Sequence, residues 1–95
     1  MKKLQTQSFG YVIGQAYLIR TVTMIYTGRL VGITDQELWI AEAAWIAETE
    51  RYADTLRSGG FREVEPYPHG VVIAVGRGAI VDAAPWSHAL PRSQK

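Results

Sequence analysis

Hydrophobic residues along the chain gather in short runs separated by polar turns, a pattern typical of a mainly β protein. The first run, residues 17–23, is rich in Tyr, Ile, Val and Thr, and it continues with little turn signal into a second strand at 24–33. Residues 34–36 follow as a tight polar turn, and residues 37–47 form the next apolar run. The first half of the chain therefore predicts three consecutive strands.

The run at 37–47 is apolar on both faces when it is drawn as a strand. One face carries Leu38, Ile40, Ala44 and Ile46, interrupted by Glu42. The other face carries Trp39, Ala41, Ala43 and Trp45. Since a half-exposed strand alternates apolar with polar residues, a helix or a second subunit is expected to cover the second face. A helix over these residues is the alternative, because a length of about ten residues does not separate the two.

The second half of the chain predicts one helix, about Glu48 to Ser58, with a narrow apolar stripe and a stop at Gly59-Gly60. The prolines of residues 61–68 indicate a linker without regular structure. A strand at 71–75 is apolar on both faces and is expected to be buried. A tight connection at 76–78 leads to the last strand, residues 79–84.

Gly28 stands in the middle of the second predicted strand. Glycine inside a strand is unfavourable unless the sheet bends sharply or bulges there. We therefore interpret Gly28 as the corner of a strongly curved sheet, a device that closes a short sheet into a small barrel.

The chain has 95 residues, which predicts a single domain over 1–95 with flexible tails at 1–10 and 87–95. Lys and Arg total 10 and Asp and Glu total 9, so a net charge of +1 gives no global attraction to nucleic acid or membrane. No apolar run approaches the roughly 20 residues of a membrane helix, and glutamines interrupt the start where a signal peptide would be apolar. With no cysteine, the composition fits a reducing compartment, and we expect a cytoplasmic protein without a membrane partner.

Few side chains suggest chemistry. His69 and His88 lie 19 residues apart with no third ligand nearby, so no metal is expected. Glu42 and Asp82 are lone acids in apolar strands, either a catalytic pair or members of ion pairs. Trp39 and Trp45 are available for stacking on bases or for packing. No nucleophile motif or phosphate loop is present, so neither an enzyme nor a bound cofactor is expected.

Two stretches of the chain resemble the two sequence motifs of the Sm and Sm-like protein family. The first is Tyr26-x-Gly28-x-Leu30-Val31-Gly32-Ile33, followed by Asp35 and by Leu38-Trp39-Ile40-x-Glu42-Ala43. The second is Val72-Ile73-Ala74-Val75-Gly76-Arg77-Gly78, followed by Ile80-Val81. The long central insert and the lack of a clear N-terminal helix make the chain most similar to divergent, phage-like members of the family.

The resemblance implies a strongly bent, five-stranded small barrel with one helix inserted between the third and fourth strands. It also implies that the fourth strand pairs with the fifth strand of a neighbour, so that about five to seven copies close a homo-oligomeric ring. At the pore of such rings, single-stranded RNA is bound by the turn after the bent strand and by the Arg-Gly turn. These positions correspond here to Asp35, Arg77 and Gly78.

The chain departs from the family pattern at the residues that recognise bases. Glu37 and Ala79 stand where the family has asparagines, and residues 34–36 contain no stacking aromatic. One interpretation is a weakly RNA-binding ring in which Arg77 stacks on a base or binds phosphate. The other is a structural or adaptor ring, with Asp35 capping its turn and Arg77 paired with a carboxylate across the subunit boundary.

Overall fold

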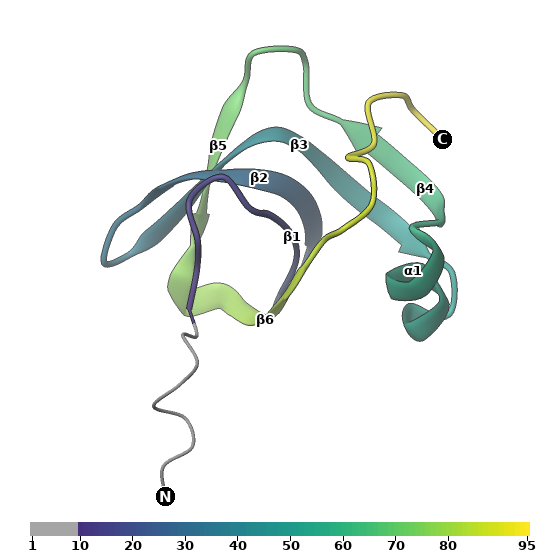
Figure 1. Cartoon of the computed structure of the whole chain (residues 1–95), viewed down its shortest axis with the longest axis horizontal. Helices are drawn as coiled ribbons and strands as arrows, with labels where there is room; N and C mark the ends of the chain where they lie inside the picture. The colour runs from purple at the N-terminus through teal and green to yellow at the C-terminus, as the bar shows by residue number, and fades with distance from the viewer. Residues whose placement is uncertain (1–9) are drawn as a thin grey trace, which may run out of the picture.

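The computed structural model describes residues 10–95, which form six strands, one α-helix and one short 3-10 helix (Figure 1). The strands are β1 (Ala16–Thr21), β2 (Ile25–Ile33), β3 (Glu37–Thr49), β4 (Phe61–Pro66), β5 (Val72–Gly76) and β6 (Ile80–Pro85). The helices are α1 (Tyr52–Ser58) and the 3-10 helix η2 (Arg77–Ala79). The prediction of a mainly β chain with one α-helix after the third strand is confirmed.

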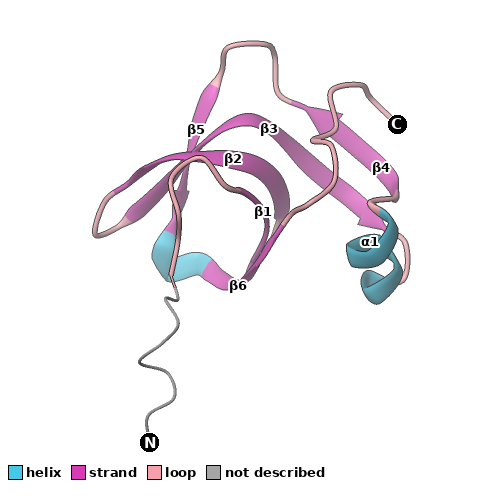
Figure 2. Ribbon diagram, viewed as in Figure 1, coloured by secondary structure: helices cyan, strands magenta, loops and turns pink. Residues whose placement is uncertain are grey.

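All strand pairs are antiparallel, and the strands form one curved sheet that does not close (Figure 2). The main path is β4-β3-β2-β1-β6, and β5 pairs with β3 outside that path. One edge of β3 lies along β2. Its other edge has two partners, because β5 pairs with residues 37–41 and β4 pairs with residues 44–49. One long strand therefore joins two parts of the sheet.

A bulge at Glu42 separates these two halves of β3. Glu42 has a φ of 51°, which is left-handed and uncommon for a residue other than glycine. Between the pairs Thr27–Ala44 and Arg29–Ala41, β3 contains one residue more than β2. An extra residue in one strand reverses the faces on which the following side chains lie. The faces predicted from simple alternation are therefore wrong beyond position 42.

The reversal gives β3 a part in two hydrophobic cores on opposite faces of the sheet. The five-strand core has buried residues from four strands, Tyr17, Ile19, Leu30, Leu38, Ile40, Ala43 and Val75, and Ile80 and Ala83 of a fifth strand, β6, pack against them. The helix-side core consists of Ala16, Leu18, Ala44, Ile46, Phe61, Val64 and Trp86, and Tyr52 and Leu56 of α1 pack against it. A helix does cover one face of the C-terminal half of β3, but it packs over Ala44 and Ile46 rather than over the face with Ala43 and Trp45 for which cover was expected, and Trp45 stays 40% exposed.

Gly28 of β2 packs directly against Ile40 of β3. A Cβ atom at this position would lie 2.8 Å from Cδ1 and 2.9 Å from Cβ of Ile40, which is closer than real carbon contacts allow. Ile40 is completely buried in the five-strand core, so it has no room to move away. This close approach supports the interpretation of Gly28 as the corner of a bent sheet.

Four expectations about the second half of the chain are wrong. Residues 61–66 of the expected linker form β4, which tolerates Pro66 because β4 lies at the edge of the sheet. The sheet has six strands rather than five for the same reason, and α1 begins at Tyr52 because β3 runs on to Thr49. The strand near 71–75 is not buried on both faces, since Val72 is 44% exposed and only Val75 is buried.

The C-terminal segment lies against α1 and β4. Trp86 is buried and stacks on Phe61 with ring centroids 5.3 Å apart, and Nε2 of His88 lies 2.8 Å from the Leu56 carbonyl. The backbones of Lys95 and Val64 exchange two hydrogen bonds of 2.9 Å. Residues 87–95, expected as a flexible tail, make these contacts, whereas residues 1–9 of the other expected tail lie outside the described part of the chain.

The close approach at Gly28 predicts that Gly28→Ala lowers the free energy of unfolding by about 1–3 kcal/mol, because the added methyl group overpacks the core beside Ile40. Chemical denaturation measures the effect. Gly32→Ala on the same strand is the matched control, since its nearest contact would be an ordinary 3.4 Å to Trp39. Equal stability of the two variants would contradict the role given to Gly28.

Candidate functional site

The turn between β2 and β3 and the 3-10 helix η2 lie side by side at one end of the sheet. The backbone N–H of Arg77 donates to the Gln36 carbonyl at 2.8 Å, and its Nη1 donates to the Thr34 carbonyl, also at 2.8 Å. The structure therefore brings the segment that contains Asp35 next to the segment that contains Arg77 and Gly78. These are the three residues that the resemblance to Sm proteins implies for RNA contact.

Thr34 holds the first turn in shape. Its Oγ1 accepts hydrogen bonds from the backbone N–H groups of Gln36 at 3.2 Å and Glu37 at 2.9 Å. A threonine hydroxyl that binds backbone groups two and three residues later stabilises a turn without help from other side chains. The Asp35 side chain is exposed and has no hydrogen bond to another described residue. Turn capping, the structural role considered for Asp35, is therefore carried out by Thr34.

Arg77 is exposed, and its guanidinium group is held by two neighbours. Besides the bond to Thr34, its Cζ lies 5.7 Å from the centroid of the Tyr11 ring, within the range of a cation–π interaction. Within residues 10–95 it forms no ion pair. Arg77 is thus positioned over the turn with donor groups that one carbonyl does not saturate.

Gly78 follows Arg77 in η2 and is fully accessible. A Cβ atom at this position would meet nothing within 4 Å, and the backbone is not in the left-handed region. Packing in the single chain therefore does not require glycine at position 78. A Cβ atom there would contact no other residue of the described range 10–95.

The two acids in apolar strands each form an ion pair. Glu42 lies 2.7 Å from Arg29, and Asp82 accepts a hydrogen bond of 2.8 Å from Nε of Arg20 and a second one from its Nη2. The hydrogen bonds from Arg20 lower the pKa of the Asp82 carboxyl below its ordinary value. Of the two alternatives from the sequence, these contacts support ion pairing rather than a catalytic pair.

The histidines lie in unrelated surroundings. His88 packs edge-on against Trp86, with ring centroids 4.8 Å apart, whereas His69 is exposed in the loop before β5. In the part of the chain that the structure describes, no group of three His, Cys, Asp or Glu side chains is placed to hold a metal ion. None of the helices there is long and apolar enough to cross a membrane.

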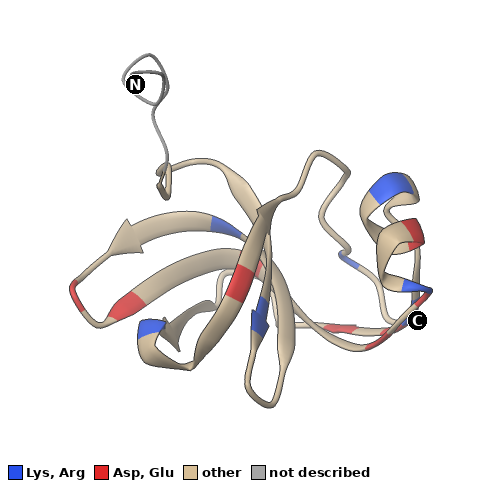
Figure 3. Ribbon diagram, turned by 90° about the horizontal axis from the view of Figure 1, so that it is seen from below, with Lys and Arg blue, Asp and Glu red and all other residues tan. Residues whose placement is uncertain are grey.

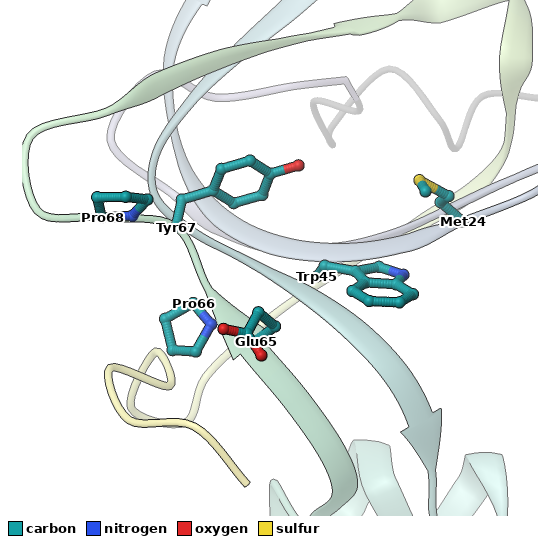
Figure 4. A pocket seen from close by; sticks show the side chains of 6 residues that line it. All are labelled: Met24, Trp45, Glu65, Pro66, Tyr67 and Pro68. Carbon is teal, nitrogen blue, oxygen red and sulfur yellow. The ribbon is translucent and has the colours of Figure 1, made fainter.

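The two candidate tryptophans lie on opposite faces of β3. Trp39 is 38% exposed and Trp45 is 40% exposed. Trp45 borders a cleft of about 390 Å³ whose other walls come from the β1–β2 turn, from β4 and from the loop after β4 (Figure 4). Sequence reasoning missed this cleft because it treated residues 61–68 as a linker. The sequence offered a single sign of a strand here, the apolar residues Phe61 and Val64, which are both buried in the structure. Their spacing of three residues does not fit the two-residue period of a strand.

Within residues 10–95, charged residues do not form a basic surface. In the view of Figure 3, basic and acidic positions are interspersed over the ribbons rather than gathered by sign. Many are paired within the described chain, as in Arg20–Asp82, Arg29–Glu42 and Arg57–Asp54. Attraction of a polyanion would therefore depend on single positions such as Arg77.

Comparison of the chain with protein-family models, with curated proteins and with solved structures finds no match. The candidate site is therefore interpreted from the chain's own residues and from its resemblance to the two Sm motifs.

Proposed function

We propose that this chain assembles into a homo-oligomeric, Sm-like ring and that the ring contacts single-stranded RNA weakly through the turns at Asp35 and Arg77. The observation that carries the assembly is that β5 and β6 each have a paired strand on one side only. β5 pairs with β3, and β6 pairs with β1. Open strand edges present unpaired backbone N–H and C=O groups that another chain can complete.

Both open strands carry exposed apolar side chains. Val72 of β5 is 44% exposed and Val81 of β6 is 64% exposed. β5 contains no charged residue and no proline, the two features that commonly protect an edge from pairing. In β6, the one charged residue, Asp82, is paired with Arg20. Pairing with another copy would bury apolar surface as well as complete the ladder.

The open edges of β5 and β6 lie at different borders of the sheet, one beyond β3 and the other beyond β1. A contact between β5 of one copy and β6 of the next is therefore head-to-tail, and such contacts close into a ring when the rotation fits. The first motif that resembles the Sm family covers β2, the β2–β3 turn and part of β3, and the second covers β5, η2 and the start of β6. The open strands β5 and β6 are thus the strands of the second motif, for which the resemblance implies pairing between subunits, and this agreement supports a ring of about five to seven copies.

RNA contact depends on Arg77. A ring would repeat Arg77 around its axis, so that one guanidinium per subunit becomes a ring of positive charge that binds phosphate through charge-assisted hydrogen bonds. Asp35 and Glu37 beside it reduce that attraction, and the chain's net charge is only +1. We therefore propose weak binding with little base specificity.

The second candidate is a structural or adaptor ring, of the kind expected for a phage-like protein. It is favoured by the contacts that Arg77 already makes, since its guanidinium group donates to Thr34 and lies over Tyr11. An arginine that stabilises the junction of two turns has a role within the chain and does not require RNA.

Ala74 in the middle of β5 provides a test of assembly. The backbone N–H of Arg77 donates to Gln36, the residue opposite it, so every second residue of β5 counted back from Arg77 is hydrogen-bonded to β3. Ala74 is one of the residues between these, and its N–H therefore points away from β3 to the open edge. We expect Ala74→Pro to remove one donor for a neighbouring strand while leaving the bonds to β3 intact. Native mass spectrometry should find wild type as a closed oligomer and the variant mainly as monomer.

Ala74→Ser, which keeps the N–H, is the control and should remain oligomeric, and circular dichroism should give the same strand content for both variants. A wild-type chain that stays monomeric at high concentration would contradict the proposed ring. An Ala74→Pro variant as oligomeric as wild type would contradict pairing through β5.

RNA contact is tested by fluorescence anisotropy with uridine-rich and adenine-rich oligonucleotides at low and high salt. We expect saturable binding at low salt that weakens as salt is raised. Arg77→Ala removes the proposed ring of positive charge and should lower the affinity for RNA by about tenfold or more. Arg57→Ala, which removes an exposed arginine from α1, is the matched control. An intact oligomer that binds neither RNA at low salt would favour the adaptor ring.

A further inference from the structure

The cleft beside Trp45 is built by residues from three separate parts of the chain. Its lining residues are Met24, Trp45, Glu65, Pro66, Tyr67 and Pro68, around a volume of about 390 Å³. Tyr26 of β2 and Glu65 of β4 are the partners of Trp45 on the two neighbouring strands. Residues directly opposite one another in antiparallel strands lie on the same face. A tyrosine, a tryptophan and a glutamate therefore form a row across the sheet.

The walls of the cleft are held in place by backbone and side-chain bonds. The backbone N–H of Tyr67 donates to the Ala43 carbonyl at 2.9 Å, and the Tyr26 hydroxyl donates to Sδ of Met24 at 3.0 Å. Figure 4 shows the Tyr67 ring and the Met24 side chain across an opening from the Trp45 indole. Pro66 and Pro68 restrict the backbone on either side of Tyr67. The aromatic surfaces are thus arranged before any ligand binds.

Glu65 is the only charged residue among the six that line the cleft. It forms no ion pair with any residue of the described range 10–95. A second glutamate, Glu63, borders a smaller hollow on the same side of Trp45, together with Lys95. Arg92 lies beyond Glu65 and Tyr67, where its guanidinium group donates to the carbonyls of Ala43 at 3.4 Å and Tyr67 at 3.3 Å. The cleft itself therefore combines aromatic faces with one unpaired carboxylate.

This combination is complementary to a cation. The face of an indole or phenol ring attracts a positive charge, and a carboxylate adds charge-assisted hydrogen bonds. A nucleobase would also stack on Trp45, but its phosphate would be repelled by Glu65, the charged residue of the lining. The charge of the cleft therefore favours a basic polypeptide over nucleic acid.

The chain itself holds one arginine in this way. The Cζ atom of Arg20 lies 4.1 Å from the centroid of the Tyr52 ring, while Asp82 accepts hydrogen bonds from two of its nitrogens. The cleft beside Trp45 offers the same two components, an aromatic face and a carboxylate, without an arginine between them. A planar guanidinium group uses both components better than a lysine ammonium group.

We propose that this cleft binds the side chain of an arginine presented by a partner polypeptide, with the guanidinium group stacked on Trp45 and hydrogen-bonded to Glu65. The cleft lies at the C-terminal half of β3, whereas the turns at Asp35 and Arg77 lie beyond its N-terminal end. None of the six residues that line it belongs to β5 or β6. This binding site is therefore independent of both the ring and its contact with RNA.

The test is a titration followed by the indole N–H resonance of Trp45 in nuclear magnetic resonance spectra, with Trp45→Phe used to assign the signal. The probe is the capped tripeptide Gly-Arg-Gly, compared with Gly-Gln-Gly and with uridine monophosphate. We expect saturable shifts with the arginine peptide and at least about threefold to tenfold weaker binding of the glutamine peptide. Glu65→Gln should weaken binding of the arginine peptide by a similar factor while the spectrum stays that of a folded protein.

Trp39→Phe is the matched control, because Trp39 is as exposed as Trp45 and lies on the same strand but outside the cleft. It should leave the affinity for the arginine peptide unchanged. Equal binding of the arginine and glutamine peptides would overturn the proposal, as would an unchanged affinity in Glu65→Gln. Tighter binding of uridine monophosphate than of the arginine peptide would assign the cleft to nucleotides and would overturn it as well.

Discussion

The side chains of β3 change faces at Glu42, and this change lets one strand contribute to two cores. Before Glu42, Leu38 and Ile40 enter the five-strand core, and after it Ala44 and Ile46 enter the helix-side core. The change requires a left-handed backbone at a residue other than glycine, which costs about 1–2 kcal/mol for a side chain with a Cβ atom. Arg29, which pairs with the Glu42 carboxylate, and Gly28, which has no Cβ atom, lie on the strand opposite.

The same bulge determines what each end of β3 can do. Before it, β3 pairs with β5 and leads back to the turn that binds Arg77. After it, β3 pairs with β4 and turns Trp45 away from α1 toward Glu65 and Tyr67. The proposed ring and RNA contact therefore belong to one half of the strand, and the proposed arginine cleft belongs to the other. A substitution that abolishes arginine binding in the cleft need not affect assembly or RNA contact, and the reverse also holds.

Sequence reasoning succeeded where the local pattern and the final environment agree. Residues 37–47 are a strand rather than a helix, and Gly28 meets a neighbour that excludes a larger residue. The prediction of which side chains of β3 share a face was wrong because simple alternation assumes strand pairing without bulges. A bulge at a glutamate has no sequence signature. β5 was expected to be buried because apolar composition does not distinguish a central strand from an edge strand. For the candidate site, only the resemblance to Sm proteins linked Asp35 with Arg77, and the contact of Arg77 with Tyr11 had no local signal.

The most direct test of this account compares the unfolding free energies of Glu42→Gly and Glu42→Ala, which both remove the carboxylate. At an ordinary strand position glycine is less stable than alanine by about 0.5–1 kcal/mol, as Ala47→Gly on the same strand should demonstrate. If β3 changes faces through a left-handed residue 42, the order reverses and Glu42→Gly is the more stable variant by about 1 kcal/mol. A Glu42→Ala variant more stable than Glu42→Gly would contradict the bulge and the two-core arrangement that depends on it.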